Sequence, residues 1–248
     1  MFAIYKKELK SYFITAIGYV YVGVFLAVSA LIFCYSTLIS KSYDTSFYFS
    51  TMIFAFVVLL PLLTMKLFSE EKKLRTEQML LTSPVSITGM VLGKYLAALT
   101  MFVGSLALSC INFIPLLSVA ATERREAISK AIYIGPSGAQ IIGSLVGVVL
   151  VGAAFIAVGM LVSTLTENQL ASAVITIAIL FAMVILSYVN QFISNYAVRF
   201  IIDWLCVLSR FSPFGYGRFD FAALLYYLSI SSVFVFLTIR VYEKRRWG

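Results

Sequence analysis

Residues 140–165 read QIIGSLVGVVLVGAAFIAVGMLVSTL, an unbroken apolar run without a charged side chain. A helix that crosses the hydrocarbon core of a bilayer, about 30 Å thick, needs about 20 predominantly apolar residues. A strand of a transmembrane barrel needs only about 10 residues of alternating character, so the length and continuity of this run exclude a barrel strand. The stretch therefore predicts a helix that spans a membrane.

Five other runs share this apolar character. They cover residues 18–38, 47–65, 89–117, 170–189 and 219–241. Over the whole chain, 61% of the residues are hydrophobic and 12% are charged, a composition outside the range of soluble globular domains. We therefore expect an all-α integral membrane protein in which residues 1–248 form one transmembrane domain with six spanning helices.

The basic residues predict the orientation, because loops rich in Lys and Arg stay on the cytoplasmic side. With the first residue inside, twelve of the 19 Lys and Arg face the cytoplasm and seven face the other side. Both ends of the chain are therefore expected to be cytoplasmic. The first apolar run has full spanning length and no small-residue cleavage pattern, so we expect it to remain in the mature protein.

The first 15 residues predict an amphipathic helix that lies in the membrane interface. Apolar side chains recur at helical spacing and lysines fall on the other side: Phe2, Tyr5, Leu9, Tyr12 and Phe13 against Lys6, Lys7 and Lys10. Such a helix is either a surface anchor or an elbow that transmits motion into the first span. The pattern leaves both roles open.

The formal net charge of +8 suggests a polyanionic partner. Because the cations flank apolar spans and do not gather on one soluble face, we expect anionic membrane lipids and no nucleic acid as partners. Cys34, Cys110 and Cys206 are isolated thiols, and the chain has no histidine. We therefore expect no metal site and interpret the thiols as small apolar side chains.

The densest group of charges lies in residues 66–94, KLFSEEKKLRTEQMLLTSPVSITGMVLGK. Ser69 suits an N-cap, and the two glutamates that follow it lie in the first turn, where the helix dipole favours anions. Pro84 marks a stop. These signals predict a cytoplasmic helix over residues 69–84. A charged helix between two spans is either a solvated loop or a docking element for a cytoplasmic partner.

Several short motifs in and beyond this segment belong together. They are FSEEKK at residues 68–73 with Thr76, LLTSPVS at 80–86, VLGK at 91–94, LYYLS at 225–229 and FLTIRVYEKRRW at 236–247. In these motifs the chain resembles type 2 ABC exporter permeases, and within them the gliding-motility and copper-maturation branch. Arg75 departs from the family pattern, in which glycine often precedes the threonine.

The resemblance implies a six-span subunit of an ATP-driven exporter in the bacterial cytoplasmic membrane. Such a subunit forms the translocation path with a second permease subunit, identical or different, and both rest on a dimer of cytoplasmic ABC ATPases. Apolar walls favour a lipid-like, amphipathic or peptide cargo. The family layout also implies short extracytoplasmic helices over residues 191–218, before the last span.

The same resemblance implies that residues 69–84 form a coupling helix seated in a groove of the ATPase. Residues 164–170 would make a second, smaller contact. The residues assigned to ATPase coupling in this way are Ser69, Glu70, Glu71, Lys72, Lys73, Arg75, Thr76, Glu77, Pro84 and Glu167.

The chain lacks a phosphate-binding loop, which needs Gly, four residues, and then Gly-Lys followed by Ser or Thr. The nearest approach runs from Gly89 to Lys94, has three intervening residues and is followed by Tyr95. We therefore expect no catalytic residue and no cofactor on this chain. ATP and Mg²⁺ would be bound by the partner ATPase.

The main alternative is a self-contained secondary transporter or channel. Such proteins usually carry ionisable groups inside their spans, and none lies near the middle of a predicted span here. Asn112 is the strongest polar residue deep in a helix, and we interpret it as an interhelical hydrogen bond rather than a substrate contact. An intramembrane enzyme is disfavoured, because histidine is absent and no two aspartates share a span.

A pair of glycines in the first quoted run bears on helix packing. Gly143 and Gly147 form a GxxxG step, and glycines at this spacing let another backbone approach closely. The step predicts a tightly packed neighbour, which is either another part of this chain or the partner subunit.

Overall fold

The computed structural model describes residues 1–39, 45–75, 86–117, 138–190 and 206–247, and within these ranges it is helical with no strand. Among the described residues, six helices are long and apolar enough to cross a membrane, as predicted. Their bounds are α2 Ala16–Phe33, α3 Ser46–Thr64, α6 Ile87–Ser109, α8 Gly138–Leu165, α9 Gln169–Val189 and α12 Phe221–Trp247. A π-helical segment, Cys34–Ile39, continues α2, and a 3₁₀ turn, Cys110–Asn112, continues α6.

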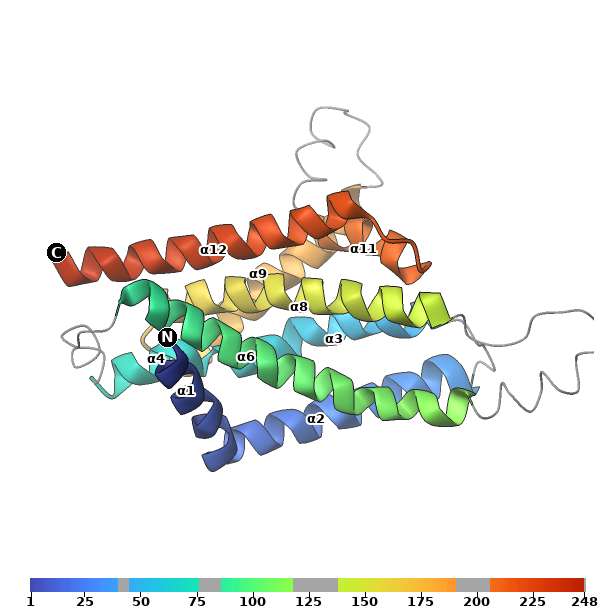
Figure 1. Ribbon diagram of the computed structural model, residues 1–248, viewed down its shortest axis with the longest axis horizontal. Helices are drawn as coiled ribbons and strands as arrows, with labels where there is room; N and C mark the ends of the chain where they lie inside the picture. The colour runs from blue at the N-terminus through green and yellow to red at the C-terminus, as the bar shows by residue number, and fades with distance from the viewer. Residues whose placement is uncertain (40–44, 76–85, 118–137, 191–205, 248) are drawn as a thin grey trace, which may run out of the picture.

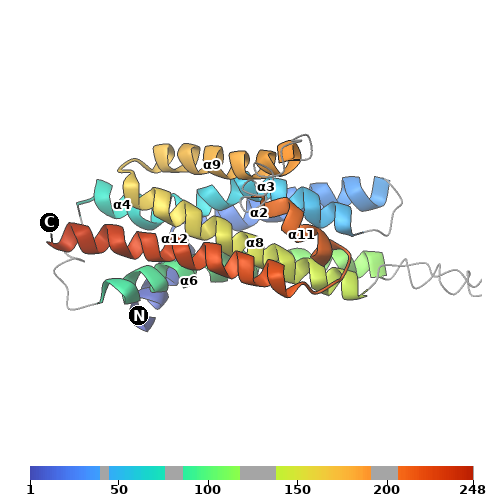
Figure 2. The ribbon, with the colours of Figure 1, turned by 90° about the horizontal axis from the view of Figure 1, so that it is seen from above.

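Helix α8 lies at the centre of the bundle, beside α3, α6, α9 and α12 (Figures 1 and 2). Its glycines explain this position. A side chain at Gly152 would overlap the ring of Phe102 on α6, and one at Gly159 would overlap Thr64 at the end of α3. Without Cβ atoms at these positions, α8 approaches both neighbours closely.

The core between α2, α3 and α6 is aromatic. The rings of Phe25 and Phe56 stack with centroids 5.9 Å apart, and Phe102 meets both edge-on at 6.2 and 5.1 Å. All three side chains are fully buried. Edge-to-face and offset-stacked pairs of this kind add to the packing of a helix interface beyond the area they bury.

In the described ranges, three short helices accompany the spans: α1 Phe2–Ile14, α4 Lys66–Lys73 and α11 Val207–Gly215. Helix α1 runs steeply across the direction of the long helices and ends at Thr15, where the backbone is extended (Figure 1). The expected helix over the first 15 residues is therefore present. It packs on α6 as well as on α2, so it is a docked element of the bundle.

Both chain ends lie at the same end of the bundle, together with α4 (Figure 1). We call this the basic end, because the lysines of α4 and the basic last turn of α12 gather there. The structure thus places the two ends on one side of the six spans, whereas the side of the membrane they face remains an expectation from the sequence.

The opposite end contains Asn112 in the turn that continues α6. Its Nδ2 donates to Ser29 Oγ on α2 at 3.2 Å, and Ser29 Oγ lies 2.9 Å from the hydroxyl of Tyr48 on α3. The expected interhelical hydrogen bond of Asn112 is confirmed. The polar side chain therefore links three helices inside the bundle.

Helix α11 also lies toward this opposite end and packs across the start of α8. A Cβ at Gly143 would lie 2.9 Å from the carbonyl oxygen of Phe214, and a Cβ at Gly147 would lie 2.9 Å from the ring of Phe211. The glycine step therefore faces α11 of the same chain. Of the segment predicted to hold short helices before the last span, residues 191–205 lie outside the described residues.

Candidate functional site

Lys94 is the most unusual side chain of the basic end. It lies two turns into α6, whose N-cap Ser86 accepts a hydrogen bond from Gly89 N at 3.3 Å. Its side chain is 1% exposed. A lysine that is removed from water must be paired and hydrogen-bonded, because an unpaired buried ammonium is strongly destabilising.

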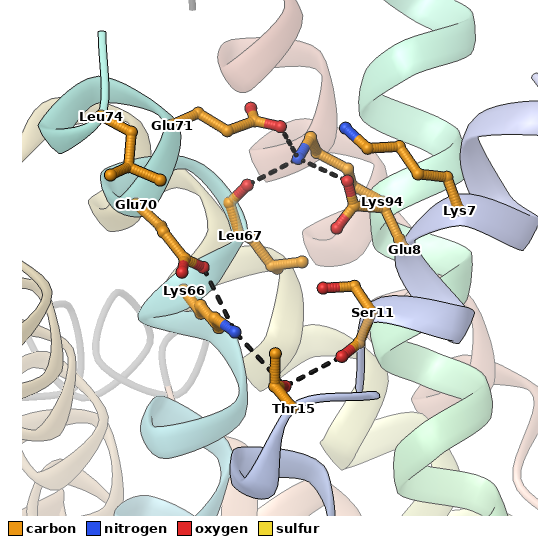
Figure 3. Close-up of a pocket in the computed structure, with 10 residues that line it drawn as sticks. All are labelled: Lys7, Glu8, Ser11, Thr15, Lys66, Leu67, Glu70, Glu71, Leu74 and Lys94. Atoms are coloured by element: carbon orange, nitrogen blue, oxygen red, sulfur yellow. Dashed lines mark hydrogen bonds and ion pairs between the residues drawn. The ribbon is translucent and has the colours of Figure 1, made fainter. Parts of the chain in front are cut away.

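The Lys94 ammonium contacts three acceptors from two other helices (Figure 3). Its Nζ lies 2.8 Å from Glu71 Oε1 and 2.8 Å from the Leu67 carbonyl oxygen on α4, and 3.0 Å from Glu8 Oε1 on α1. The ammonium also lies 5.0 Å from the ring centroid of Phe68. An ammonium has three N–H donors, so all of its donors are occupied. We call Lys94, Glu8 and Glu71 the Lys94 cluster.

The cluster joins α1, α4 and α6. Gly93 permits the approach of α1, because a Cβ there would lie 3.2 Å from the Met1 carbonyl oxygen and 3.3 Å from Tyr5 N. A second contact fixes the other end of α1, where the Tyr12 hydroxyl donates to the Leu63 carbonyl at 3.2 Å. Burial, with a smaller contribution from the charge of Glu8, raises the pKa of the Tyr12 hydroxyl, so this group remains a donor.

Helix α4 differs from the helix predicted over residues 69–84. It begins at Lys66, directly after α3, and the expected N-cap role of Ser69 is wrong. Ser69 lies inside the helix, is fully buried, and donates its hydroxyl to the Met65 carbonyl. The reason is that Leu67 and Phe68 are buried in the core, which extends the helix back to the end of the second span.

A second junction connects α4 to α8. Ser163 Oγ accepts hydrogen bonds from Phe68 N at 3.1 Å and from Ser69 N at 3.2 Å. The carbonyl oxygen of the following residue, Thr164, accepts hydrogen bonds from Lys72 Nζ and from Arg245 Nη2, the latter at 2.8 Å. Two cations at the last turn of α8 match the negative end of its helix dipole. We call this the Thr164 junction, and it adds α12 to the connected elements.

The described part of α4 ends at Lys73, followed by a turn at Leu74 and Arg75. Arg75 has a φ of 56°, a left-handed conformation that favours glycine. The prediction of an uninterrupted helix over residues 69–84 is therefore wrong, because the helix is broken at this turn. Thr76, Glu77 and Pro84 lie outside the described residues.

We expect Arg75→Gly to raise the free energy of unfolding by about 0.5–1 kcal/mol, because glycine removes the steric penalty of the left-handed conformation. The matched control is Lys73→Gly, two residues earlier at the right-handed last residue of α4, which should lower it by up to about 1 kcal/mol. Both effects are measured as shifts in detergent-induced unfolding of the purified protein. Equal destabilisation by the two changes would contradict the assigned turn.

The sequence-predicted coupling residues that the structure describes differ in their surroundings. Glu71 and Lys72 are tied into the Lys94 cluster and the Thr164 junction, with 14% of the Glu71 side chain exposed. Lys73 and Arg75 are exposed. Glu167 is also exposed, in the short link between α8 and α9, where Asn168 Oδ1 accepts from Leu170 N at 3.0 Å. The structure therefore brings Glu167 to the basic end but not into either junction.

A cavity of about 390 Å³ lies beside the Lys94 cluster, between α1, α4 and α6 (Figure 3). It is lined by Lys7, Glu8, Ser11, Thr15, Lys66, Leu67, Glu70, Glu71, Leu74 and Lys94. The lining thus combines three lysines, three glutamates and two hydroxyls at one end of a bundle whose spans are apolar.

Sequence reasoning missed the Lys94 cluster and the Ser163 contact. One signal was available for Lys94, since it falls within the third apolar run and a lysine inside a span requires a partner. Its partners are remote, Glu8 by 86 positions and Glu71 by 23. Ser163 carries no comparable signal in an apolar run. No protein-family model, curated protein or solved structure matches the chain.

Proposed function

We propose that the chain is the transmembrane subunit of an ATP-driven exporter in a bacterial cytoplasmic membrane, with the basic end facing the cytoplasm. It works with a second permease subunit and a dimer of cytoplasmic ATPases, and its cargo is lipid-like, amphipathic or peptidic. The observation that carries the proposal is the connection between α4 and the rest of the bundle. Helix α4 leads directly into the segment that resembles a coupling helix.

Two junctions support a mechanical role for α4. The Lys94 cluster ties it to α1 and α6, and the Thr164 junction ties it to α8 and α12. A buried, fully paired polar network resists separation, because breaking it leaves charged groups without partners. Displacement of α4 by an ATPase would therefore move several spans together. A charged segment that was only a solvated loop would not require contacts of this kind with four other helices.

The isolated chain should hydrolyse no ATP, because it has no phosphate-binding loop. The test is to purify the tagged protein from its native membranes in mild detergent, identify copurifying chains by mass spectrometry, and assay hydrolysis. We expect a second chain with a phosphate-binding loop to copurify, and we expect the complex to hydrolyse ATP. Hydrolysis by the isolated chain, or ATP-independent transport by that chain in vesicles, would overturn the proposal and favour a secondary transporter.

The docking surface is tested with exposed charges. Reversing Lys73 and Arg75 to glutamate should reduce the recovered ATPase at least tenfold, since a loss of about 1.4 kcal/mol, less than reversed charges at an interface cost, is already tenfold. The control is Arg218→Glu, an exposed residue at the opposite end. Glu71 is unsuitable for this purpose, because its reversal would place two ammonium groups together at Lys94. Full ATPase recovery with both variants would contradict docking at this turn.

A further inference from the structure

We propose that the cavity between α1, α4 and α6 binds the headgroup of a zwitterionic phospholipid of the phosphoethanolamine class. The lipid phosphate would meet Lys66 and Ser11, and the lipid ammonium would meet Glu70. This assignment does not depend on the proposed ATP-driven export. It requires only that the chain spans a bilayer.

The position of the cavity brings it next to lipid. Thr15, which lines it, is the break between α1 and the first span α2. The two residues before this break, Phe13 and Ile14, are exposed by 51% and 71%. Apolar side chains exposed beside a spanning helix lie at the boundary between headgroups and acyl chains. A lipid there would have its headgroup at the level of the cavity.

Two lysines of the lining differ in how well they are paired. The Lys94 ammonium has contacts of 2.8, 2.8 and 3.0 Å, which occupy its donors. In the described part of the chain, Lys66 Nζ has contacts of 3.4 Å to Glu70 Oε2 and 3.4 Å to Thr15 Oγ1, both longer than a good charge-assisted hydrogen bond. The Lys66 side chain is nevertheless only 9% exposed. A buried ammonium with long contacts favours a further acceptor such as a phosphate oxygen.

One other group is placed to share that phosphate. The Ser11 hydroxyl points into the cavity from α1, on the side of Thr15 and Lys66, whereas Lys7 lies at the upper end of the cavity beside Lys94 (Figure 3). A hydroxyl from α1 and an ammonium group from α4 form a donor set suited to phosphate oxygens.

The charge balance selects a zwitterion over an anion. Lys7, Lys66 and Lys94 are matched by Glu8, Glu70 and Glu71, so the lining carries no net formal charge. Glu70 is 35% exposed, which leaves its carboxylate able to accept from a primary ammonium. A quaternary choline group has no N–H to donate, so the same carboxylate discriminates phosphoethanolamine from phosphocholine headgroups. The volume of about 390 Å³ lies within the range of small-ligand sites.

The experiment is native mass spectrometry of the full-length purified protein, titrated separately with phosphatidylethanolamine, phosphatidylcholine and phosphatidylglycerol of identical acyl chains. We expect phosphatidylethanolamine to bind roughly tenfold more tightly than either of the others, as one or two charge-assisted hydrogen bonds would give. Soluble phosphoethanolamine should bind far more weakly than the lipid, because it lacks acyl chains.

Two variants assign the contacts. Lys66→Met should lower phosphatidylethanolamine binding roughly tenfold, and Glu70→Gln should remove the preference over phosphatidylcholine while leaving binding itself. Lys73→Met, an exposed lysine outside the cavity lining, is the matched control and should bind like the unaltered protein. Each variant is first shown to be folded by its unfolding transition, and Glu70→Gln provides the test if Lys66→Met does not fold.

Three outcomes would overturn the proposal. One is equal binding of the three lipids, and another is tighter binding of phosphatidylglycerol, which would indicate a purely anionic site. The third is equal binding of soluble phosphoethanolamine and the lipid, which would assign the cavity to a soluble ligand. Loss of binding in Lys66→Met with retention in Lys73→Met supports it.

Discussion

Replacing Lys94 by methionine is expected to lower the free energy of unfolding by about 3–5 kcal/mol, the loss typical when one partner of a buried ion pair is removed. Methionine replaces the aliphatic stem of lysine and lacks only the terminal ammonium group, so most of the loss comes from charge rather than from a cavity. The carboxylates of Glu8 and Glu71, 13% and 14% exposed, would be left without their cation. The measurement is the unfolding transition of the purified protein in mixed micelles.

Two comparisons separate this effect from a general loss of a cation. Arg240→Met removes an exposed pair with Glu243, in which the arginine side chain is 62% exposed, and should lower stability by less than about 1 kcal/mol. Changing both cluster glutamates to glutamine in the Lys94→Met background should restore most of the loss, since no unpaired charge remains. A Lys94→Met protein as stable as Arg240→Met would show that the cluster does not hold these helices together.

Gly152→Ala is expected to lower the free energy of unfolding by about 2–3 kcal/mol, although alanine is normally the better helix former. Its Cβ would overlap the Phe102 ring, which is fully buried and meets Phe56 edge-on at 5.1 Å. The ring therefore has no space to move away, and α6 must separate from α8. The same unfolding assay in mixed micelles measures the change.

The control is Gly104→Ala on α6, where an added Cβ meets nothing within 4 Å. This change should leave stability unaltered or raise it by up to about 1 kcal/mol. Combining Gly152→Ala with Phe102→Leu should recover part of the loss, because the smaller side chain makes room for the Cβ. If alanine has the same effect at both glycines, the close contact of α6 and α8 is wrong.

The six spans could be predicted because length and apolar character are local properties of a sequence. The run at 170–189 is found as Gln169–Val189, and that at 140–165 as Gly138–Leu165. The second span was predicted to end at residue 65, and α3 ends at Thr64, but a second helix, α4, follows directly and carries the helical segment on to Lys73. The charged residues of α4 hid this helix from the apolar pattern. It is held by the burial of Leu67 and Phe68, which depends on neighbouring helices that the sequence pattern does not specify.

The candidate site was only partly predictable. The charged segment after the second span was singled out, and the exposure of Lys73 and Arg75 fits a docking interpretation. Glu71, by contrast, is largely buried because it pairs with Lys94, which is 23 positions away in the sequence. No periodicity within one helix identifies such a partner. The left-handed turn at Arg75 was likewise hidden, because arginine gives no local signal for a positive φ.

The separation of Glu8 from Lys94 by 86 positions also constrains biosynthesis. A ribosome delivers α1 and two complete spans before it delivers the lysine that holds α1 in place. During that interval the acidic side chains of α1 and α4 must remain in contact with water at the membrane surface. The Thr164 junction closes later still, because Arg245 is contributed by the last helix. Both junctions can therefore be complete only after the chain has been synthesised as far as Arg245.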